Sequence, residues 1–186
     1  MHIKRGTSRL VICLPKLGLV IKVPLARPFV FVGHVINSIN RGRQSKNIKK
    51  RLKWAVWLGK DTDVVDNIRY TLLNGTYQNW QEYRLWRCTR SSFLEPTFCS
   101  LLGLINVQKY GEQLTGISKV ALWSQLLELS NQAVWSNGHH FANPDNFSFR
   151  EGVIRMLDYG GHGMEYVVVE HGENIARHFT LSKEPS

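Results

Sequence analysis

The chain has 186 residues, of which 43% are hydrophobic and 20% are charged, a composition typical of one globular domain and too apolar for a disordered chain. No apolar run approaches the roughly 20 residues that a membrane-spanning helix needs, and no signal-peptide core follows the basic N-terminus, so we expect a soluble protein of the cytoplasm. The three cysteines, Cys13, Cys88 and Cys99, are scattered without a Cys-x-x-Cys, which argues against a disulfide framework or a cysteine zinc site.

Positive charge is concentrated at the start of the chain. The formal net charge is +10, and residues 1–60 hold 14 of the 24 Lys and Arg but no Asp or Glu. Such a segment attracts phosphate-bearing partners, so we expect a nucleotide and, as a further partner, nucleic acid or a host protein. The basic run within it also fits a plain solvated helix face. Its candidate contact residues are Lys46, Lys49, Lys50, Arg51 and Lys53.

The first part of the chain predicts a β-hairpin. Residues 9–14 and 19–23 are short β-branched runs, and the Pro and Gly of residues 15–18 are typical of a turn between them. An apolar stretch that fits a strand or a helix follows, and then two helical patterns. These segments are residues 29–39, 47–58 and 66–73, the last closed by Asn74-Gly75.

The middle of the chain predicts a helix and then a strand. Trp80, Tyr83 and Trp86 recur at helical spacing within residues 78–88, a segment that also contains Glu82. Residues 101–107 form an apolar run that predicts a strand.

The second half of the chain predicts one long helix and a second hairpin. The helix is expected over residues 117–135, stopped by Asn137-Gly138. The hairpin is expected over residues 147–149 and 153–157, and a strand at residues 166–169 precedes a polar tail. The residues expected on the buried face of the long helix are Val120, Trp123, Leu127 and Val134.

Residues 139–160, HHFANPDNFSFREGVIRMLDYG, carry the most informative pattern. A protein-kinase catalytic loop has the pattern H-R-D-L-x-x-x-N, and a D-F-G follows after a short hairpin. Here His139 takes the histidine position, Asn146 falls seven positions later, and Asp158-Tyr159-Gly160 follows the predicted hairpin. The segment resembles the protein-kinase-like superfamily in its minimal bacterial or phage form. It also fits a simple loop and hairpin in which Asp158 is a turn residue.

Three earlier features stand in the order that this resemblance requires. Val20-Ile21-Lys22 resembles the V-A-I-K lysine strand, Glu82 resembles the helix glutamate that pairs with that lysine, and residues 104–111 resemble the strand and hinge beside the adenine. The resemblance implies an α+β fold, bilobal in miniature. Residues 1–111 would form a small β-sheet lobe with a basic insertion at about 27–75, and residues 112–186 a reduced helical lobe.

The resemblance also implies ATP and Mg²⁺ as ligands. Lys22 would hold phosphates and Glu82 would hold Lys22. The metal would be held by Asn146 and Asp158, whose oxygens suit a hard cation and which we expect to face one cleft. Gln108 and Tyr110, in the hinge segment, would lie against the nucleotide.

The sequence departs from the family pattern at the catalytic position. Phe141 stands where the catalytic aspartate is expected, and we expect its ring to fill the space of the acceptor. The sequence contains no G-x-G-x-x-G loop, only a possible remnant at residues 5–9, and no A-P-E motif. We therefore expect a pseudokinase, or at most a slow ATP-dependent phosphotransferase. His140 and Asp145 are alternative bases, with His139 bracing the loop. The alternative is a non-enzymatic interaction protein that uses its basic half.

Overall fold

The computed structural model of the chain describes residues 1–26, 73–161 and 163–181. The segments predicted at residues 29–39 and 47–58, and nearly all of residues 66–73, lie outside this part. So do the basic residues of the 46–53 run and most of the expected basic insertion.

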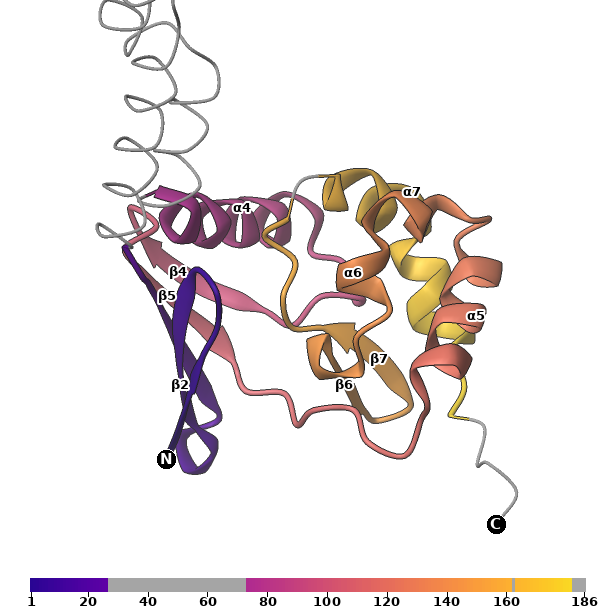
Figure 1. Ribbon diagram of the computed structural model, residues 1–186, viewed down its shortest axis with the longest axis horizontal. Helices are drawn as coiled ribbons and strands as arrows, with labels where there is room; N and C mark the ends of the chain where they lie inside the picture. Colours follow the sequence, from indigo (N-terminus) through magenta and orange to yellow (C-terminus); the bar gives the residue numbers. More distant parts are fainter. Residues whose placement is uncertain (27–72, 162, 182–186) are drawn as a thin grey trace, which may run out of the picture.

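A five-stranded antiparallel sheet forms one end of the molecule (Figure 1). The predicted hairpin is confirmed, with its two strands joined by the short helix η1 (Pro15–Leu17) and by Gly18, whose φ is 65°. The strands lie in the order β1-β2-β3-β5-β4, with bounds β1 (His2–Arg5), β2 (Arg9–Leu14), β3 (Leu19–Pro24), β4 (Thr97–Leu101) and β5 (Ile105–Lys109).

The apolar run at residues 101–107 is not the single strand that its composition predicts. It contains the end of β4, a tight turn and the start of β5. The chain reverses because Leu102 and Gly103 adopt left-handed backbone conformations, with φ of 50° and 75°. A continuous apolar run does not reveal such a turn, since its residues face the same sheet from two strands.

Helix α4 (Asn74–Thr89) lies across one face of the sheet (Figure 1). The helix predicted at residues 78–88 is confirmed but begins four residues earlier. Asn74-Gly75 therefore lies in the first turn of this helix. Gly75 is needed there because a Cβ would overlap the carbonyl oxygen of Ser8, where the helix approaches the sheet.

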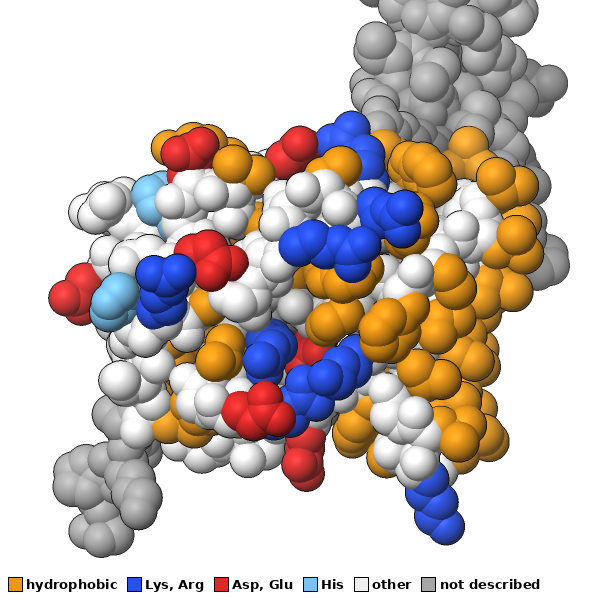
Figure 2. Space-filling view, turned by 180° about the vertical axis from the view of Figure 1, so that it is seen from behind, with side chains coloured by type: hydrophobic (Ala, Val, Ile, Leu, Met, Phe, Trp, Pro, Cys, Tyr) orange, Lys and Arg blue, Asp and Glu red, His pale blue; other side chains and the backbone are white. Residues whose placement is uncertain are grey.

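The opposite face of the sheet is apolar. Side chains alternate along a strand, so the residues that precede and follow Lys22 on β3 point away from α4. One cross-strand row on that outer face consists of Ile3, Ile12, Ile21, Val107 and Cys99. Figure 2 shows hydrophobic side chains gathered over this end of the molecule.

The other end of the molecule packs helices around a short hairpin. The predicted hairpin is confirmed as β6 (Phe147–Arg150) and β7 (Val153–Met156), and helix α7 (Met164–His178) contacts β7. The core here includes Phe93, Leu122, Phe147 and Ile154, all fully buried. The remaining elements are α5 (Lys119–Leu129), η3 (Ala133–Asn137), α6 (Gly138–Phe141) and η4 (Pro144–Asn146).

The long helix predicted at residues 117–135 is wrong in length, and of the predicted face Trp123, Leu127 and Val134 pack in or against the core whereas Val120 does not. It begins at Lys119, capped by the Ser118 hydroxyl, and ends at Leu129 because Asn131 and Gln132 have φ of 48° and 67°. Leu122 and Leu126 face the core, whereas Val120 is 74% exposed. Gly138, expected to stop the helix, instead begins α6.

The strand and polar tail predicted after residue 161 are also wrong. Helix α7 occupies this region. Its buried residues include Met164, Val167, Val168 and Ile175, which recur at intervals that place them on one face of a helix. That apolar face fills the core beneath the hairpin.

The predicted α+β class is confirmed, with an antiparallel sheet and the long helices α4, α5 and α7. None of the helices described here is long and apolar enough to cross a bilayer. All three cysteines are free thiols, and Cys13 is buried.

Candidate functional site

A cleft of about 600 Å³ lies between the sheet and the segments that precede and follow the β6–β7 hairpin. One wall comes from β1, β2, β3 and β5, and the other from residues near His140, Asn146 and Asp158. This volume lies within the ordinary range of small-molecule sites. The predicted convergence of Asn146 and Asp158 on one cleft is confirmed.

Lys22 and Glu82 form the ion pair that the sequence predicts. Lys22 Nζ on β3 lies 3.0 and 2.8 Å from the two carboxylate oxygens of Glu82 on α4. Both residues are buried, with 4% and 0% of their surface exposed. Lys22 also donates a hydrogen bond of 2.6 Å to the carbonyl of Leu157, next to Asp158. Burial of these charges is tolerable because each is paired.

Arg9 is a central member of the site that the sequence did not reveal. It lies at the start of β2 and is 5% exposed. Its Nη1 donates to Glu82 Oε1 at 2.8 Å and to Asn79 Oδ1 at 3.3 Å, and its Nη2 forms an ion pair with Asp158 Oδ1. Strand alternation was the available signal, because it places Arg9 on the same face of the sheet as Val11 and Lys22. A cation buried on that face needs a carboxylate as its partner.

The four charges of this network are balanced and shift each other's pKa. Burial favours a raised pKa for Asp158, but the charges of Arg9 and Lys22 outweigh it and hold the pKa at about 2, below the ordinary 3.8. Burial likewise opposes the charge of Arg9, yet Asp158 and Glu82 raise its pKa. For Lys22, burial lowers the pKa against the opposing effect of Glu82. The two carboxylates thus neutralise the two cations.

The remnant loop expected at residues 5–9 is the turn between β1 and β2, and it lines the cleft. The Gly6 N–H donates to the Arg9 carbonyl at 2.9 Å, and the Ser8 hydroxyl donates to Gln78 Oε1 at 2.5 Å. This turn therefore holds Lys4 and Arg5 on the same wall as Arg9.

The part of the cleft farther along the strands is apolar. Cys13 and Val20 line it from the sheet, next to Val11, which lies in register between Lys4 and Lys22, and Leu157 lines it from the other wall. Tyr110, from the expected hinge, lines the cleft just after β5. Such surfaces suit a flat, largely apolar group.

Gln108 belongs to β5 and not to the connection that follows it. Its side-chain amide is buried and donates to the carbonyls of Leu157 at 3.2 Å and Glu95 at 3.4 Å. Gln108 thus braces the two walls, although part of it lines the cleft.

Phe141 does not fill the acceptor space, contrary to the expectation. It is fully buried in the core, and its ring centroid lies 6.4 Å from that of Phe147. His139 lies in the same short helix, and its side chain is outside the description. The position of the missing aspartate is therefore a packing position.

Both alternative bases, His140 and Asp145, line the cleft. His140 Nε2 lies close to Gly161, where an added Cβ would come within 3.1 Å of it. The Asp145 carbonyl accepts a 3.0 Å hydrogen bond from Gln113, which in turn accepts one from Lys4. This chain of contacts bridges the mouth of the cleft.

One of the two residues expected to hold Mg²⁺ is already engaged by a cation of the protein. Asp158 Oδ1 is already bound by the guanidinium of Arg9. The Asn146 amide nitrogen donates to the His140 carbonyl at 2.9 Å, which fixes the orientation of that side chain and leaves its oxygen as the atom that could face a cation. Among the described residues, no group of three His, Cys, Asp or Glu side chains could hold a metal ion.

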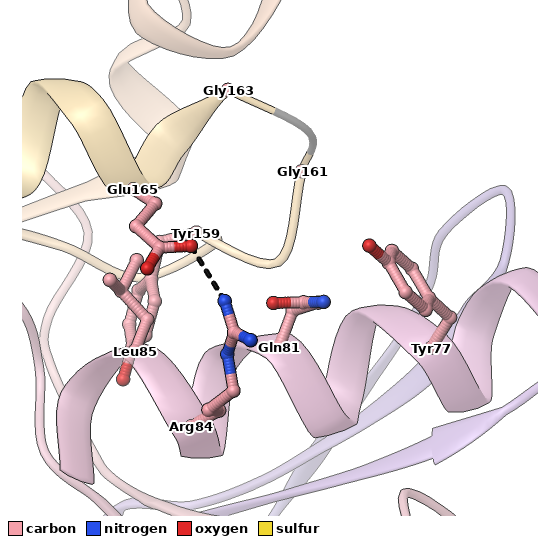
Figure 3. A pocket seen from close by; sticks show the side chains of 8 residues that line it. All are labelled: Tyr77, Gln81, Arg84, Leu85, Tyr159, Gly161, Gly163 and Glu165. Carbon is pink, nitrogen blue, oxygen red and sulfur yellow. Dashed lines mark hydrogen bonds and ion pairs between the residues drawn. The ribbon is translucent and has the colours of Figure 1, made fainter. Parts of the chain in front are cut away.

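A second pocket, of about 130 Å³, lies between α4 and the start of α7 (Figure 3). Figure 3 shows the ion pair of Arg84 with Glu165 at its rim, at 2.6 Å. Beside it, Gly160 packs so closely on α4 that a Cβ would overlap the Gln78 carbonyl. This pocket is too small for a nucleotide, but it shows how tightly the segment after Asp158 is held.

No protein-family model, curated protein or solved structure matches the chain. Its function is therefore inferred from the chemistry of the larger cleft. One part of that cleft presents Lys and Arg side chains, and the adjoining part presents apolar ones. This combination suits a ligand with a flat ring and an anionic tail.

Proposed function

We propose that the chain is a kinase-like protein that binds a nucleotide in the larger cleft and is impaired in phosphoryl transfer. The observation that carries this proposal is the buried ion pair of Lys22 with Glu82, next to Asp158. In kinases a strand lysine, held by a helix glutamate, positions the nucleotide phosphates.

The arrangement of the cleft supports a nucleotide as the ligand. Val11, Val20 and Leu157 would enclose the base, and the cations on the sheet wall would face the phosphates. The sheet with α4 corresponds to a small lobe, and α5, α6, α7 and the β6–β7 hairpin to a reduced second lobe. This correspondence supports the bilobal kinase-like fold as part of the proposal.

Impaired transfer follows from the catalytic position. A phenyl ring cannot accept a proton, and Phe141 lies in the core, away from the cleft. Loss of a positioned general base costs about 10²–10⁴-fold in rate. His140 and Asp145 are the groups in the cleft that could replace it in part.

Thermal unfolding with and without ATP tests nucleotide binding. At a ligand concentration 100 times the Kd, the stabilisation should be about 2.7 kcal/mol. Val11→Phe would fill the apolar part of the cleft and should abolish the shift. Ile12→Phe is the matched control, because its side chain lies on the outer face of the sheet. An unchanged shift in Val11→Phe would place the nucleotide elsewhere or reject the proposal.

A non-enzymatic function is the second candidate. The absence of any acidic residue from the first 60 positions favours a partner rich in phosphate or carboxylate groups, such as nucleic acid or an acidic host protein. This function needs no transfer chemistry and could coexist with an occupied cleft.

A further inference from the structure

The Asp158 carboxylate is engaged by a cation of the protein itself. The guanidinium of Arg9 reaches from β2 to Asp158, 149 residues later in the chain, and to Glu82 at 2.8 Å. Arg9 is 5% exposed, whereas the Asp158 side chain is 39% exposed. The Asp158 carboxylate, which lines the cleft, is thus neutralised by a buried cation of the protein.

Displacing Arg9 by a divalent cation would be costly. Lys22 already binds both oxygens of Glu82. Without Asp158, the buried guanidinium would therefore share one carboxylate with a buried ammonium. A buried charge that loses its partner is strongly destabilising. Mg²⁺ at a phosphate site needs at least one or two carboxylates beside the phosphates, and the Asp158 carboxylate is already paired with Arg9.

The cations of the cleft lie on one wall. Lys4, Arg5, Arg9 and Lys22 come from the three N-terminal strands, whereas the carboxylates of Asp145 and Asp158 come from the opposite wall. Of these carboxylates, Asp158 is paired with Arg9. A phosphate group under the β1–β2 turn would therefore meet positive charge without an added metal ion.

We propose that the cleft binds the phosphates of a nucleoside triphosphate without a divalent cation, and that Arg9 confers this metal independence. The inference rests on the proposed function of the cleft as a nucleotide site. Arg9 acts in two ways, because it occupies the carboxylate that Mg²⁺ would need and neutralises the negative charge that Asp158 would otherwise present to the phosphates. Its planar fork directs Nη1 to Glu82 and Nη2 to Asp158 from one fixed geometry.

Calorimetric titration of the protein with ATP, in EDTA and in Mg²⁺, tests the proposal. The wild type should bind ATP in EDTA at least as tightly as in Mg²⁺. Arg9→Gln frees Asp158 and should weaken binding in EDTA about tenfold or more, while Mg²⁺ restores part of it. Arg84→Gln, in an exposed ion pair outside the larger cleft, is the matched control. Binding by the wild type only in Mg²⁺ would overturn the proposal.

Asp158→Asn gives an independent test if Arg9→Gln does not fold. This variant leaves Arg9 paired with Glu82 and removes a negative charge from the phosphate path. It should bind ATP in EDTA at least as tightly as the wild type. A metal-dependent site would instead lose binding, because Asp158 would be a ligand. Mn²⁺ alone, titrated into the wild type and into Asp158→Asn, should give the same result for both proteins. A Mn²⁺ site that is present in the wild type and lost in Asp158→Asn would contradict metal independence.

Inorganic tripolyphosphate separates failure of this inference from failure of the proposed function. If tripolyphosphate binds in EDTA as tightly as ATP, and Val11→Phe affects neither, the cleft is a metal-free phosphate site but not a nucleotide site. If ATP binds and requires Mg²⁺, the nucleotide function stands and metal independence is wrong. Absence of binding by both ligands, with and without Mg²⁺, rejects both.

Discussion

At the scale of single residues, Glu82 is the partner of two buried cations. Glu82→Gln would remove the carboxylate that Lys22 contacts and one of the two carboxylates that Arg9 contacts. We expect a loss of about 3–5 kcal/mol in the free energy of unfolding, as for other broken buried pairs. Urea denaturation measures it. Glu165→Gln, in the exposed pair with Arg84, is the matched control and should cost at most about 1 kcal/mol.

Asp158 should make the protein sensitive to acid. Its pKa is about 2 in the folded state and near 3.8 when unfolded, so the folded state binds fewer protons between these values. The stability that Asp158 contributes is complete above its unfolded pKa and is lost as the pH falls from 3.8 towards about 2. In Asp158→Asn, the free energy of unfolding should fall less steeply over this window. Equal slopes in both proteins would mean that the Arg9 pair adds no stability.

Phe141→Asp should not create an efficient kinase. The substitution places a carboxylate in the core against Phe147, and loss of the ring alone typically costs about 3–5 kcal/mol. Labelled γ-phosphate transfer to the protein and to generic acceptors should be absent or very slow in both proteins. Phe141→Leu, which keeps the core apolar, controls for packing. Robust transfer by the wild type, abolished in Asp158→Ala, would refute impaired catalysis.

The sequence revealed some residues of the site and not others for physical reasons. Lys22 and Glu82 were recognisable because a strand and a helix with local signals present them in a known order. Arg9 was not, since its partners lie 73 and 149 residues away and no local pattern encodes such a distance. The kinase pattern predicts Phe141 in the acceptor space of the cleft. In the structure its side chain joins the core, because burial of a phenyl ring is favourable.

At the scale of secondary structure, local signals predicted the hairpins and failed where packing decides. The two confirmed hairpins combine β-branched residues with turn residues. Helix α7 contains Val167, Val168 and Val169, whose branched side chains favour a strand. The helix prevails because Met164, Val167, Val168 and Ile175 then face the core together.

Gly160 couples α4 to the segment that carries Asp158. A Cβ on Gly160 would overlap the Gln78 carbonyl, so Gly160→Ala should push this segment away from the helix. We expect a loss of about 1–3 kcal/mol, as for other overpacked sites. Thermal unfolding measures it. Gly161→Ala is the neighbouring control, because the nearest atom there is the end of the His140 side chain, and an equal loss in that variant would exclude a specific role for Gly160.

At the scale of the whole molecule, the charge distribution predicts binding to polyanions. Residues 1–60 carry 14 Lys and Arg without an acidic residue. Affinity for duplex DNA, RNA or heparin should fall by orders of magnitude between about 50 and 200 mM salt, because several phosphate contacts release counterions. Competition with ATP would show whether the cleft takes part. No binding at the lower salt concentration would leave the charge as ordinary surface.

The pairing of Arg9 with Asp158 also sets an order of events during synthesis. At about 5–20 residues per second, a ribosome adds Asp158 on the order of 10 s after Arg9. The three N-terminal strands are complete much earlier, but their inward cations still lack Glu82 and Asp158. Arg9 and Lys22 must therefore stay hydrated while the chain grows, because burying them alone would be too costly. The charge network of the cleft is therefore complete only after Asp158, its last carboxylate, has been added.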